Sequence, residues 1–378
     1  MSMIDVAREM APVFSARAAD GEAERTMPAD LVALARAAGL FGIAVPRSLG
    51  GLELDPRTVL GVVEEISRAD GSAGWTVLIG NATAFFAWLD PATTKEMLGD
   101  EPGAVSTGVF APSGRAVPAG DGHLMLDGRW SFNSGCVHAD WFQTGFMVMD
   151  GDEPARRPDG RPDWRFAYYR REQAEVIDTW RSTGLRGTGS HDVAVRGLRI
   201  PEAHTAMPFH DPPRHQSDLL ELGFSAFTAV LLAGFPLGVA RRALDEIVAL
   251  APTKRRPHLD GTVADDRQAQ LAIGRAEARL QSARAFVHDA FGRAWCTIGA
   301  GSPATPRERG TILLATQHAM EAAVHAVDAA HLLAGSTAVA DDHPLARCHR
   351  DILTARQHVV FSGERFAEYA RERLGLAA

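Results

Sequence analysis

The chain has 378 residues, of which 46% are hydrophobic and 23% charged, and its formal net charge is -8. These are the values of an ordinary globular protein, and the length suffices for two or three domains with a well-buried core. The acidic balance gives no electrostatic basis for binding nucleic acid or an anionic membrane, so neither is expected as a partner. The three cysteines, Cys136, Cys296 and Cys348, lack metal-ligand spacing and predict neither a metal site nor a disulfide framework.

The first residues, Met-Ser-Met-Ile-Asp-Val-Ala-Arg-Glu, lack the basic and apolar regions of a secretory signal, so we expect a cytoplasmic protein. The uncharged run 223–240 reaches the length of a membrane span. It contains Gly234, Pro236 and Gly238, and no other stretch resembles a span. The composition therefore favours a helix buried inside the protein.

Residues 1–104 carry helical patterns. The segment 28–40 has apolar residues at helical spacing and ends at a glycine. After a turn at 46–51, a second helix is predicted from about Asp55 to the Arg-Ala-Asp-Gly break at 68–71. We therefore expect an N-terminal helical domain.

Residues 105–205 have a different sequence pattern, in which glycine and proline separate short apolar runs. The runs at 122–132 and 192–201 are typical of β-strands. Between them, residues 150–165 are rich in Pro, Asp, Arg and Gly, and are expected to form an exposed loop. The segment predicts a β domain.

Residues 206–378 return to helical patterns. Over 273–294 the apolar residues alternate spacings of three and four, as in a helix packed against others. The capping box Thr-Pro-Arg-Glu at 305–308 predicts the start of the next helix, and a last long helix should begin near Pro344. With a buried helix at 223–250 as the first member, these segments predict a C-terminal four-helix bundle.

This order of a helical domain, a β domain and a four-helix bundle resembles the acyl-CoA dehydrogenase fold over nearly the whole chain. Five motifs narrow the resemblance to the branch that contains the two-component flavin monooxygenases. That branch includes hydroxylases of secosteroid phenols and of 4-hydroxyphenylacetate, dibenzothiophene monooxygenases and amino-sugar N-oxygenases. The motifs lie at 46–52, 64–75, 130–141, 178–190 and 344–358.

One departure from the dehydrogenases is chemical. Those enzymes need a carboxylate to remove an α-proton from an acyl thioester, and in the commonest subgroup it lies in a Tyr-Glu-Gly-Thr-like stretch near the end of the bundle. The corresponding stretch here, Arg-Gln-His-Val-Val-Phe at 356–361, contains no acid. A histidine with an ordinary pKa of about 6.5 suits deprotonation of a phenol better than of an α-carbon. The resemblance therefore favours oxygen transfer.

Two residues are the catalytic candidates that the resemblance implies. In the monooxygenase branch, the histidine of an Arg-Asp-x-x-x-Ala-x-x-His helix faces the substrate, and His358 follows Arg350, Asp351 and Ala355 in that register. Ser134 lies where the family places the residue nearest the flavin N5 and C4a edge, where its hydroxyl could help a C4a-hydroperoxide persist in a dry pocket. The alternatives are a structural histidine and a turn serine.

The same resemblance assigns flavin contacts to residues around the middle motif. Trp130, Phe132 and Asn133 align with a Trp-Ile-Thr-Asn stretch that lines one face of the isoalloxazine, although Phe132 replaces a hydroxyl-bearing residue there. Val109 and Phe110 occupy the place of a loop that contacts the pyrimidine side of the ring. A plain β-turn is the alternative for that loop.

Further contacts follow from the glycine-rich turn and from the aromatic residues. Arg186, Thr188 and Ser190 lie in a turn whose N-H groups and guanidinium could hold a flavin phosphate, or which could simply join two strands. The turn has no P-loop or dinucleotide-fold spacing. The substrate is expected to contact Trp75, Phe235 and Phe361, and an ordinary core role is the alternative for Trp75.

The resemblance implies the oxygenase component of a two-component flavin-dependent monooxygenase. Such an enzyme takes reduced flavin, FMN or FAD, from a separate NAD(P)H:flavin reductase, and the chain has no nicotinamide-binding Gly-x-Gly-x-x-Gly unit of its own. With O2 it would hydroxylate a small phenol- or indole-like aromatic substrate through a C4a-hydroperoxyflavin. A homotetramer built through the bundle is expected. The alternatives are an acyl-CoA dehydrogenase-like oxidase or dehydrogenase with another base, and a catalytically silent binding or assembly subunit.

Overall fold

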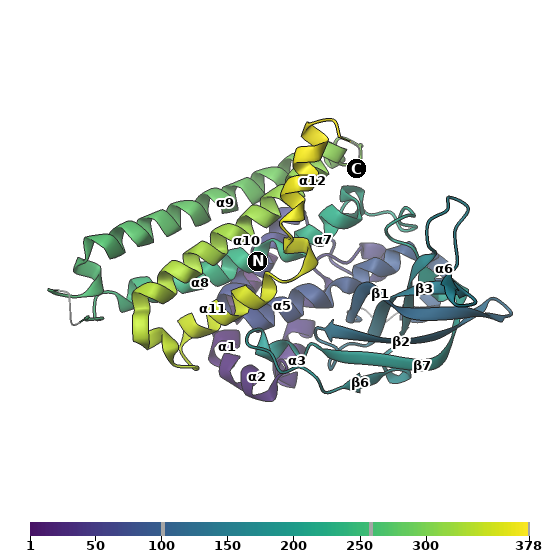
Figure 1. Ribbon diagram of the computed structural model, residues 1–378, viewed down its shortest axis with the longest axis horizontal. Helices are drawn as coiled ribbons and strands as arrows, with labels where there is room; N and C mark the ends of the chain where they lie inside the picture. Colours follow the sequence, from purple (N-terminus) through teal and green to yellow (C-terminus); the bar gives the residue numbers. More distant parts are fainter. Residues whose placement is uncertain (100–102, 257–259, 377–378) are drawn as a thin grey trace.

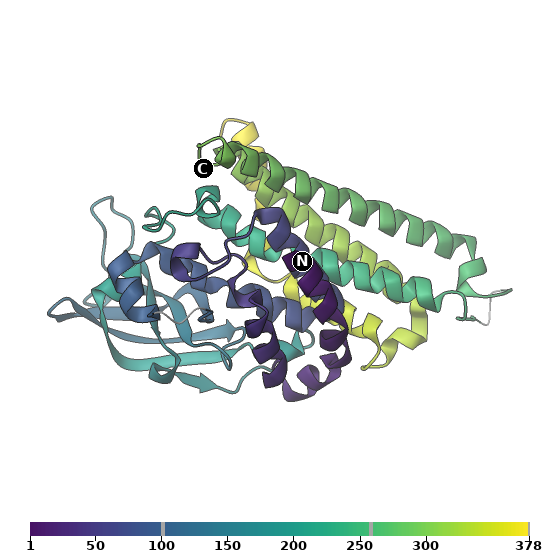
Figure 2. The same ribbon diagram turned by 180° about the vertical axis from the view of Figure 1, so that it is seen from behind.

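The computed structural model describes residues 1–99, 103–256 and 260–376. The strands gather at one end of the molecule and the long C-terminal helices at the other, with the N-terminal helices packed against both (Figures 1 and 2). The two larger hydrophobic cores among the described residues support this arrangement. The larger joins the N-terminal and C-terminal helices and reaches one side of the sheet, and the smaller lies within the β domain.

The N-terminal helices begin and end as their local sequence dictates. The carboxylate of Asp55 accepts the backbone N-H groups of Arg57 and Thr58 at the start of α4, and Asp70 ends α4 and caps α5 in turn. The two helices predicted from the sequence are thereby confirmed as α3 and α4. The helices are α1 (Met3–Ala16), α2 (Ala18–Glu24), α3 (Ala29–Ala37), α4 (Pro56–Ala69), α5 (Gly71–Gly80) and α6 (Pro91–Leu98).

The β domain is one mixed sheet with the order β6-β7-β2-β1-β3-β5-β8, and β4 pairs with β3. Strands β1 and β3 are parallel and the other pairs are antiparallel. The strands are β1 (Ser106–Gly120), β2 (His123–Asn133), β3 (Trp141–Asp150), β4 (Glu153–Pro154), β5 (Trp164–Arg170), β6 (Glu175–Ile177), β7 (His191–Pro201) and β8 (Thr205–Ala206).

Both predicted strands are present as β2 and β7, but the loop predicted at 150–165 is partly wrong. The segment is largely exposed, as expected. However, Gly151 takes a positive φ of 63°, which lets β4 fold back and pair with the end of β3. Strand β5 also begins within the segment, at Trp164.

The C-terminal helices form the predicted bundle, in which α8, α9, α10 and α11 lie together (Figure 1). Within the described residues one helical stretch, Phe224–Leu250, is long and apolar enough to span a membrane, and 83% of its 18-residue apolar window is buried inside the protein. The sequence prediction of a core helix agrees with this burial. The helices are α7 (Phe224–Leu232), α8 (Gly234–Leu250), α9 (Arg267–Gly299), α10 (Pro306–Ala334), α11 (Pro344–Ala355) and α12 (Glu364–Arg373).

The helix that begins at Pro344 is shorter than the sequence predicts, and it is not the last, because α12 follows it. Helix α11 ends at Ala355, and His358 lies beyond it with an extended backbone, φ -69° and ψ 139°. There the imidazole caps the short 3-10 helix Val359–Phe361 by accepting the N-H of Val360. The histidine is therefore not on a helix but in the turn that follows one.

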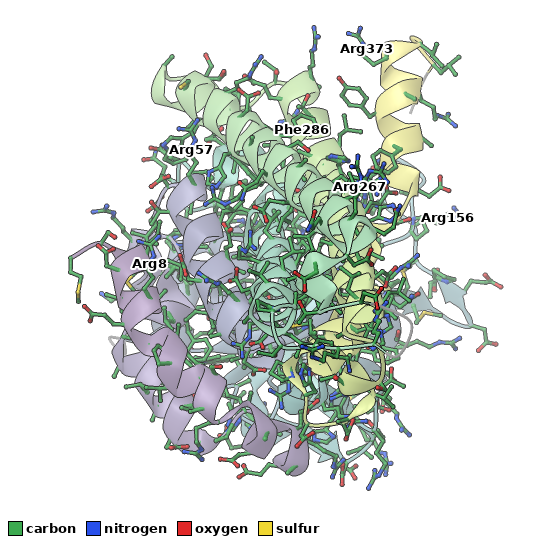
Figure 3. All side chains as sticks on the ribbon, turned by 90° about the vertical axis from the view of Figure 1, so that its left-hand side faces the viewer. Arg8, Arg57, Arg156, Arg267, Phe286 and Arg373 are labelled. Carbon is green, nitrogen blue, oxygen red and sulfur yellow. The ribbon has the colours of Figure 1, made fainter. Side chains whose placement is uncertain are left out.

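The bundle meets the N-terminal domain at backbone contact between α8 and α4. A Cβ atom on Gly234 would lie 2.4 Å from the carbonyl oxygen of Leu60, and one on Gly238 would lie 2.2 Å from that of Glu64. Only glycine permits this approach. In the first turn of α4, Arg57, which is labelled in Figure 3, donates from Nε to the carbonyl oxygen of His288 on α9 at 3.1 Å.

Candidate active site

Trp75, on α5, brings three predicted site residues together. Its side chain is 5% exposed, and its indole Nε1 donates to Oγ of Ser134 at 3.0 Å. The indole ring packs edge-on against Phe235 of α8 and against the imidazole of His358, with ring centroids 5.1 Å and 5.6 Å away. The ring of Phe361 also lies beside the imidazole, with centroids 6.4 Å apart. One indole therefore joins the end of β2 to the bundle.

A row of hydroxyl groups continues from Ser134 into the glycine-rich turn. Oγ of Ser134 lies 2.8 Å from Oγ of Ser190, which lies 2.6 Å from Oγ1 of Thr188. Oγ1 of Thr188 donates to the carbonyl oxygen of Leu185 at 2.8 Å. These hydroxyl groups are buried, so the turn is fixed to the end of β2 by their mutual hydrogen bonds.

His358 is a neutral hydrogen-bond donor at physiological pH. Burial lowers the pKa of its imidazole to about 4. Nδ1 accepts the backbone N-H of Val360 at 3.3 Å. Because a ring nitrogen that accepts carries no proton in the neutral imidazole, the remaining proton is on Nε2.

The end of β2 offers groups that fit a flavin ring. Phe132 takes a positive φ of 67° and is 73% exposed, with its ring edge-on to Trp180 at 6.3 Å. Asn133 is fully buried; its Oδ1 accepts from Thr107, but its Nδ2 has no partner within the described residues. An unpaired buried amide costs about 1–3 kcal/mol, so an acceptor from outside the chain is expected. The polar edge of an isoalloxazine carries such acceptors.

Trp130 differs from the sequence prediction. Its side chain is fully buried in the β core, and its Nε1 donates to the carbonyl oxygen of Gly145 at 2.7 Å. A Cβ on Gly114 or Gly128 would lie 2.4 Å or 2.5 Å from the indole, so the indole packs directly on both glycines. The ring thus presents no surface to a flavin, and Trp130 supports the site only through the strand that it anchors.

Val109 and Phe110 lie at an irregularity rather than in a plain turn. The pairing of β1 with β3 shifts register between Val109 and Gly114. The ring of Phe110 stacks on Phe166 at 4.8 Å and packs against Phe224 of α7 at 5.6 Å. Because the side chain of Phe110 lies in this aromatic cluster, its predicted flavin contact would involve its backbone.

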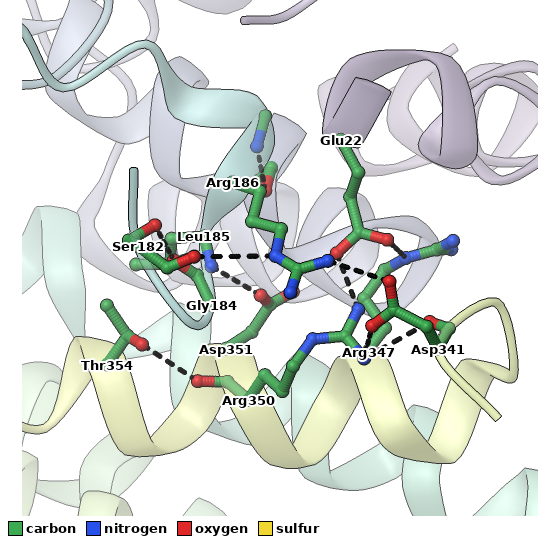
Figure 4. A network of polar contacts seen from close by, with 12 residues as sticks. Glu22, Ser182, Gly184, Leu185, Arg186, Asp341, Arg347, Arg350, Asp351 and Thr354 are labelled. Carbon is green, nitrogen blue, oxygen red and sulfur yellow. Dashed lines mark hydrogen bonds and ion pairs between the residues drawn. The ribbon is translucent and has the colours of Figure 1, made fainter. Parts of the chain in front are cut away.

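Arg186 lies in a charged network between the three parts of the chain (Figure 4). Its Nη1 pairs with Asp341 at 2.9 Å, and its Nε donates to the carbonyl oxygen of Ser182. Arg350 also pairs with Asp341 at 2.9 Å and reaches Glu22 of α2 at 2.7 Å. The guanidinium of Arg186 thus already has a carboxylate partner, and its role toward a flavin phosphate stays a prediction.

Two buried acids beside this network were not singled out from the sequence. Asp351 is 1% exposed, and its Oδ1 accepts the N-H of Leu185 at 2.6 Å. Burial, together with the nearby charge of Asp70, raises the pKa of Asp351 to about 7, and burial raises that of Asp70 to about 6. Both acids line a cavity of about 20 Å³ with Arg347. In the sequence, the Arg-Asp pair at 350–351 was the signal that could have drawn attention to Asp351. The pair does not show that the carboxyl group is buried.

Comparison with known proteins identifies the family. The acyl-CoA dehydrogenase N-terminal domain matches residues 3–97 and the C-terminal domain matches residues 230–363. Indole-3-acetate monooxygenase of Pseudomonas putida is 33% identical over 354 residues, which cover 92% of this chain and 87% of that protein.

Two further relatives match nearly end to end. The flavin-dependent monooxygenase oxygenase subunit HsaA of Rhodococcus jostii is 26% identical, with 97% of this chain and 96% of that protein covered. The structure of XiaF from a Streptomyces species, in complex with FADH2 and glycerol, superposes with a TM-score of 0.89 at 27% identity. That match covers 99% of this chain and 95% of XiaF.

The chain therefore belongs to the acyl-CoA dehydrogenase family, whose fold it adopts throughout. Within that family it is an oxygenase of the flavin-dependent monooxygenase branch, as the sequence motifs predict.

The buried acid pair predicts a pH-dependent stability. Between about pH 4 and 7 the folded protein retains a proton on Asp351 that the unfolded chain releases, because an unperturbed aspartate has a pKa of about 3.9. Asp351 therefore costs the fold more free energy as pH rises through this window. We expect the free energy of unfolding of Asp351→Asn, taken relative to that of the wild type, to rise by about 1 kcal/mol or more from pH 5 to pH 8.

Urea denaturation at the two pH values measures this difference. Asp341→Asn is the matched control, because this exposed carboxylate belongs to the same network, and its arginine partners lower its pKa. Its effect on stability should be the same at both pH values. An Asp351→Asn effect equally independent of pH would contradict the raised pKa.

Proposed function

We propose that the chain hydroxylates a small planar aromatic compound of the indole class, with reduced flavin supplied by a separate NAD(P)H:flavin reductase. The observation that carries the proposal is the setting of His358 among aromatic rings. The indole of Trp75 and the ring of Phe361 lie beside its imidazole, Phe235 packs against that indole, and each of these three side chains is no more than 5% exposed. The name of the Pseudomonas putida relative, indole-3-acetate monooxygenase, supports a substrate of this class.

The flavin, when bound, supplies the oxygen-transfer chemistry, and the protein supplies binding, orientation and exclusion of water. Asn133 and Ser134 would hold the polar edge of the ring, and the exposed Phe132 would lie against it. The apolar side chains of Trp75, Phe235 and Phe361 would keep water from the reacting atoms.

We infer that His358 orients the substrate through Nε2-H and does not remove a proton from it. Even for a phenol, with a pKa of about 10, proton transfer to an imidazole with a pKa of about 4 would be uphill by about six pKa units, or about 8 kcal/mol, and the N-H of an indole is a weaker acid still. A neutral donor has no such penalty. Of the two roles that the sequence suggests for His358, deprotonation and orientation of the substrate, this inference favours orientation.

The other expectations stay proposals. The Rhodococcus jostii relative is named as an oxygenase subunit, which supports a separate reductase. Leu332 and Val339 are 73% and 76% exposed on or beside the bundle, which supports a homotetramer built through it. Cys136, Cys296 and Cys348 are free, which supports a cytoplasmic location.

Reconstitution tests the proposed function. Purified protein, an NADH:flavin reductase, FMN or FAD and indole-3-acetate should give a hydroxylated product only when all components and oxygen are present. If the protein's flavin is instead bleached anaerobically by an acyl thioester without reductase, the chain works as a dehydrogenase and the proposal fails.

Substitution of His358 tests its role as a donor. His358→Ala should lower product formation by about 10- to 100-fold, the equivalent of a lost hydrogen bond in a buried site. His358→Gln, whose amide places an N-H near the position of Nε2, should recover part of the loss. The ratio of wild-type to His358→Gln rates should stay constant from pH 6 to 8.5. A Gln variant as inactive as Ala, with a ratio that rises with pH, would indicate a base.

A further inference from the structure

The hydroxyl row from Trp75 to Leu185 has a defined direction. The two ends determine it: the indole N-H of Trp75 can only donate, and the carbonyl oxygen of Leu185 can only accept. Thr188 uses its single hydroxyl proton on Leu185. Ser190 must therefore donate to Thr188, and Ser134 must donate to Ser190, for each contact to hold one proton.

The opposite direction leaves a contact unsatisfied. If Thr188 donated to Ser190, its oxygen would face the carbonyl oxygen of Leu185 at 2.8 Å with no proton between them. That arrangement loses one hydrogen bond at a buried position. Hydrogen bonds that run in one direction also polarise and strengthen one another. The row therefore favours the direction that ends on Leu185.

This direction makes Ser134 an acceptor toward any ligand. Its one proton is committed to Ser190, and one of its two lone pairs already receives the indole N-H of Trp75. The lone pair that remains can only accept. N5 of a flavin carries a hydrogen in the reduced ring and a bare lone pair in the oxidised ring, so only the reduced ring offers Ser134 a donor at N5.

We propose that the hydroxyl row of Trp75, Ser134, Ser190 and Thr188 is a redox-selective binding device, which fixes Ser134 as an acceptor and thereby favours reduced over oxidised flavin. The proposal rests on the proposed function, in which Ser134 holds the polar edge of the ring, and on the sequence resemblance, which implies that Ser134 lies nearest N5. Ser190 and Thr188, predicted to hold a phosphate, act here as positioning residues. Release of oxidised flavin and capture of a fresh reduced one, which a two-component enzyme needs, follow from the preference.

Isosteric variants test the row. In Thr188→Val the terminal acceptor is lost, so Ser190 can turn its proton toward Ser134 and free the proton of Ser134 for oxidised N5. In Ser190→Ala the hydroxyl group that accepts the proton of Ser134 is removed directly. Thr188→Ser is the matched control, because it keeps the hydroxyl and should keep the direction.

The measurement is the ratio of dissociation constants for oxidised and reduced FMN, from fluorescence titration in air and anaerobic titration after photoreduction. We expect Thr188→Val and Ser190→Ala to lower this ratio by about three- to tenfold, the equivalent of one hydrogen bond, mainly through tighter binding of oxidised FMN. Thr188→Ser should retain the wild-type ratio. The midpoint potential of bound FMN should rise and fall with the same ratio.

The outcomes separate the proposal from the function on which it rests. The ratio could stay unchanged in Thr188→Val and Ser190→Ala, or the affinities for both redox forms could weaken equally. Either result would overturn the proposed role of the hydroxyl row without affecting the proposed monooxygenase function. A wild-type protein that binds neither form overturns both. Should one variant fail to fold, the other decides alone, because each breaks the row at a different hydroxyl.

Discussion

The site depends on one side chain, the indole of Trp75. Its N-H is satisfied by Ser134 at the end of β2, and its ring contacts both Phe235 of α8 and His358 after α11. Helix α5 holds this indole in place because nearly all of its residues are buried. Its first residue, Gly71, is pressed so closely against α11 that a Cβ there would lie 2.6 Å from Oδ2 of Asp351. Moving the indole would therefore disturb all three parts of the chain.

The fold also explains how a scaffold shared with dehydrogenases can serve oxygen transfer. A thioester oxidation needs a carboxylate at the reacting carbon, and the stretch 356–361 has a histidine in that region instead. Burial keeps that histidine neutral. The buried carboxylates Asp70 and Asp351 accept the backbone amides of Ala73 and Leu185, so they hold elements together. The flavin would then supply the oxygen-transfer chemistry, and the uncharged side chains around it would supply binding and orientation.

Much of the fold follows from rules that act over a few residues. The capping carboxylate of Asp55 and the capping box at Thr305 mark helix starts, and alternating apolar residues mark β2 and β7. The contacts that form the site do not follow from such rules. Trp75 and Ser134 are 59 residues apart, and Leu185 and Asp351 are 166 apart. The burial of Trp130 and the turn after Ala355 likewise come from packing between distant segments, which a motif does not encode.

Labelling with 18O2 tests most directly whether this site transfers oxygen. The reconstituted enzyme is given 18O2 and indole-3-acetate in ordinary water, and the product is examined by mass spectrometry. We predict that each hydroxylated product molecule carries one 18O atom, because the inserted oxygen comes from O2 and not from water. Product oxygen drawn from water, or consumption of 18O2 that yields only labelled hydrogen peroxide, would contradict it.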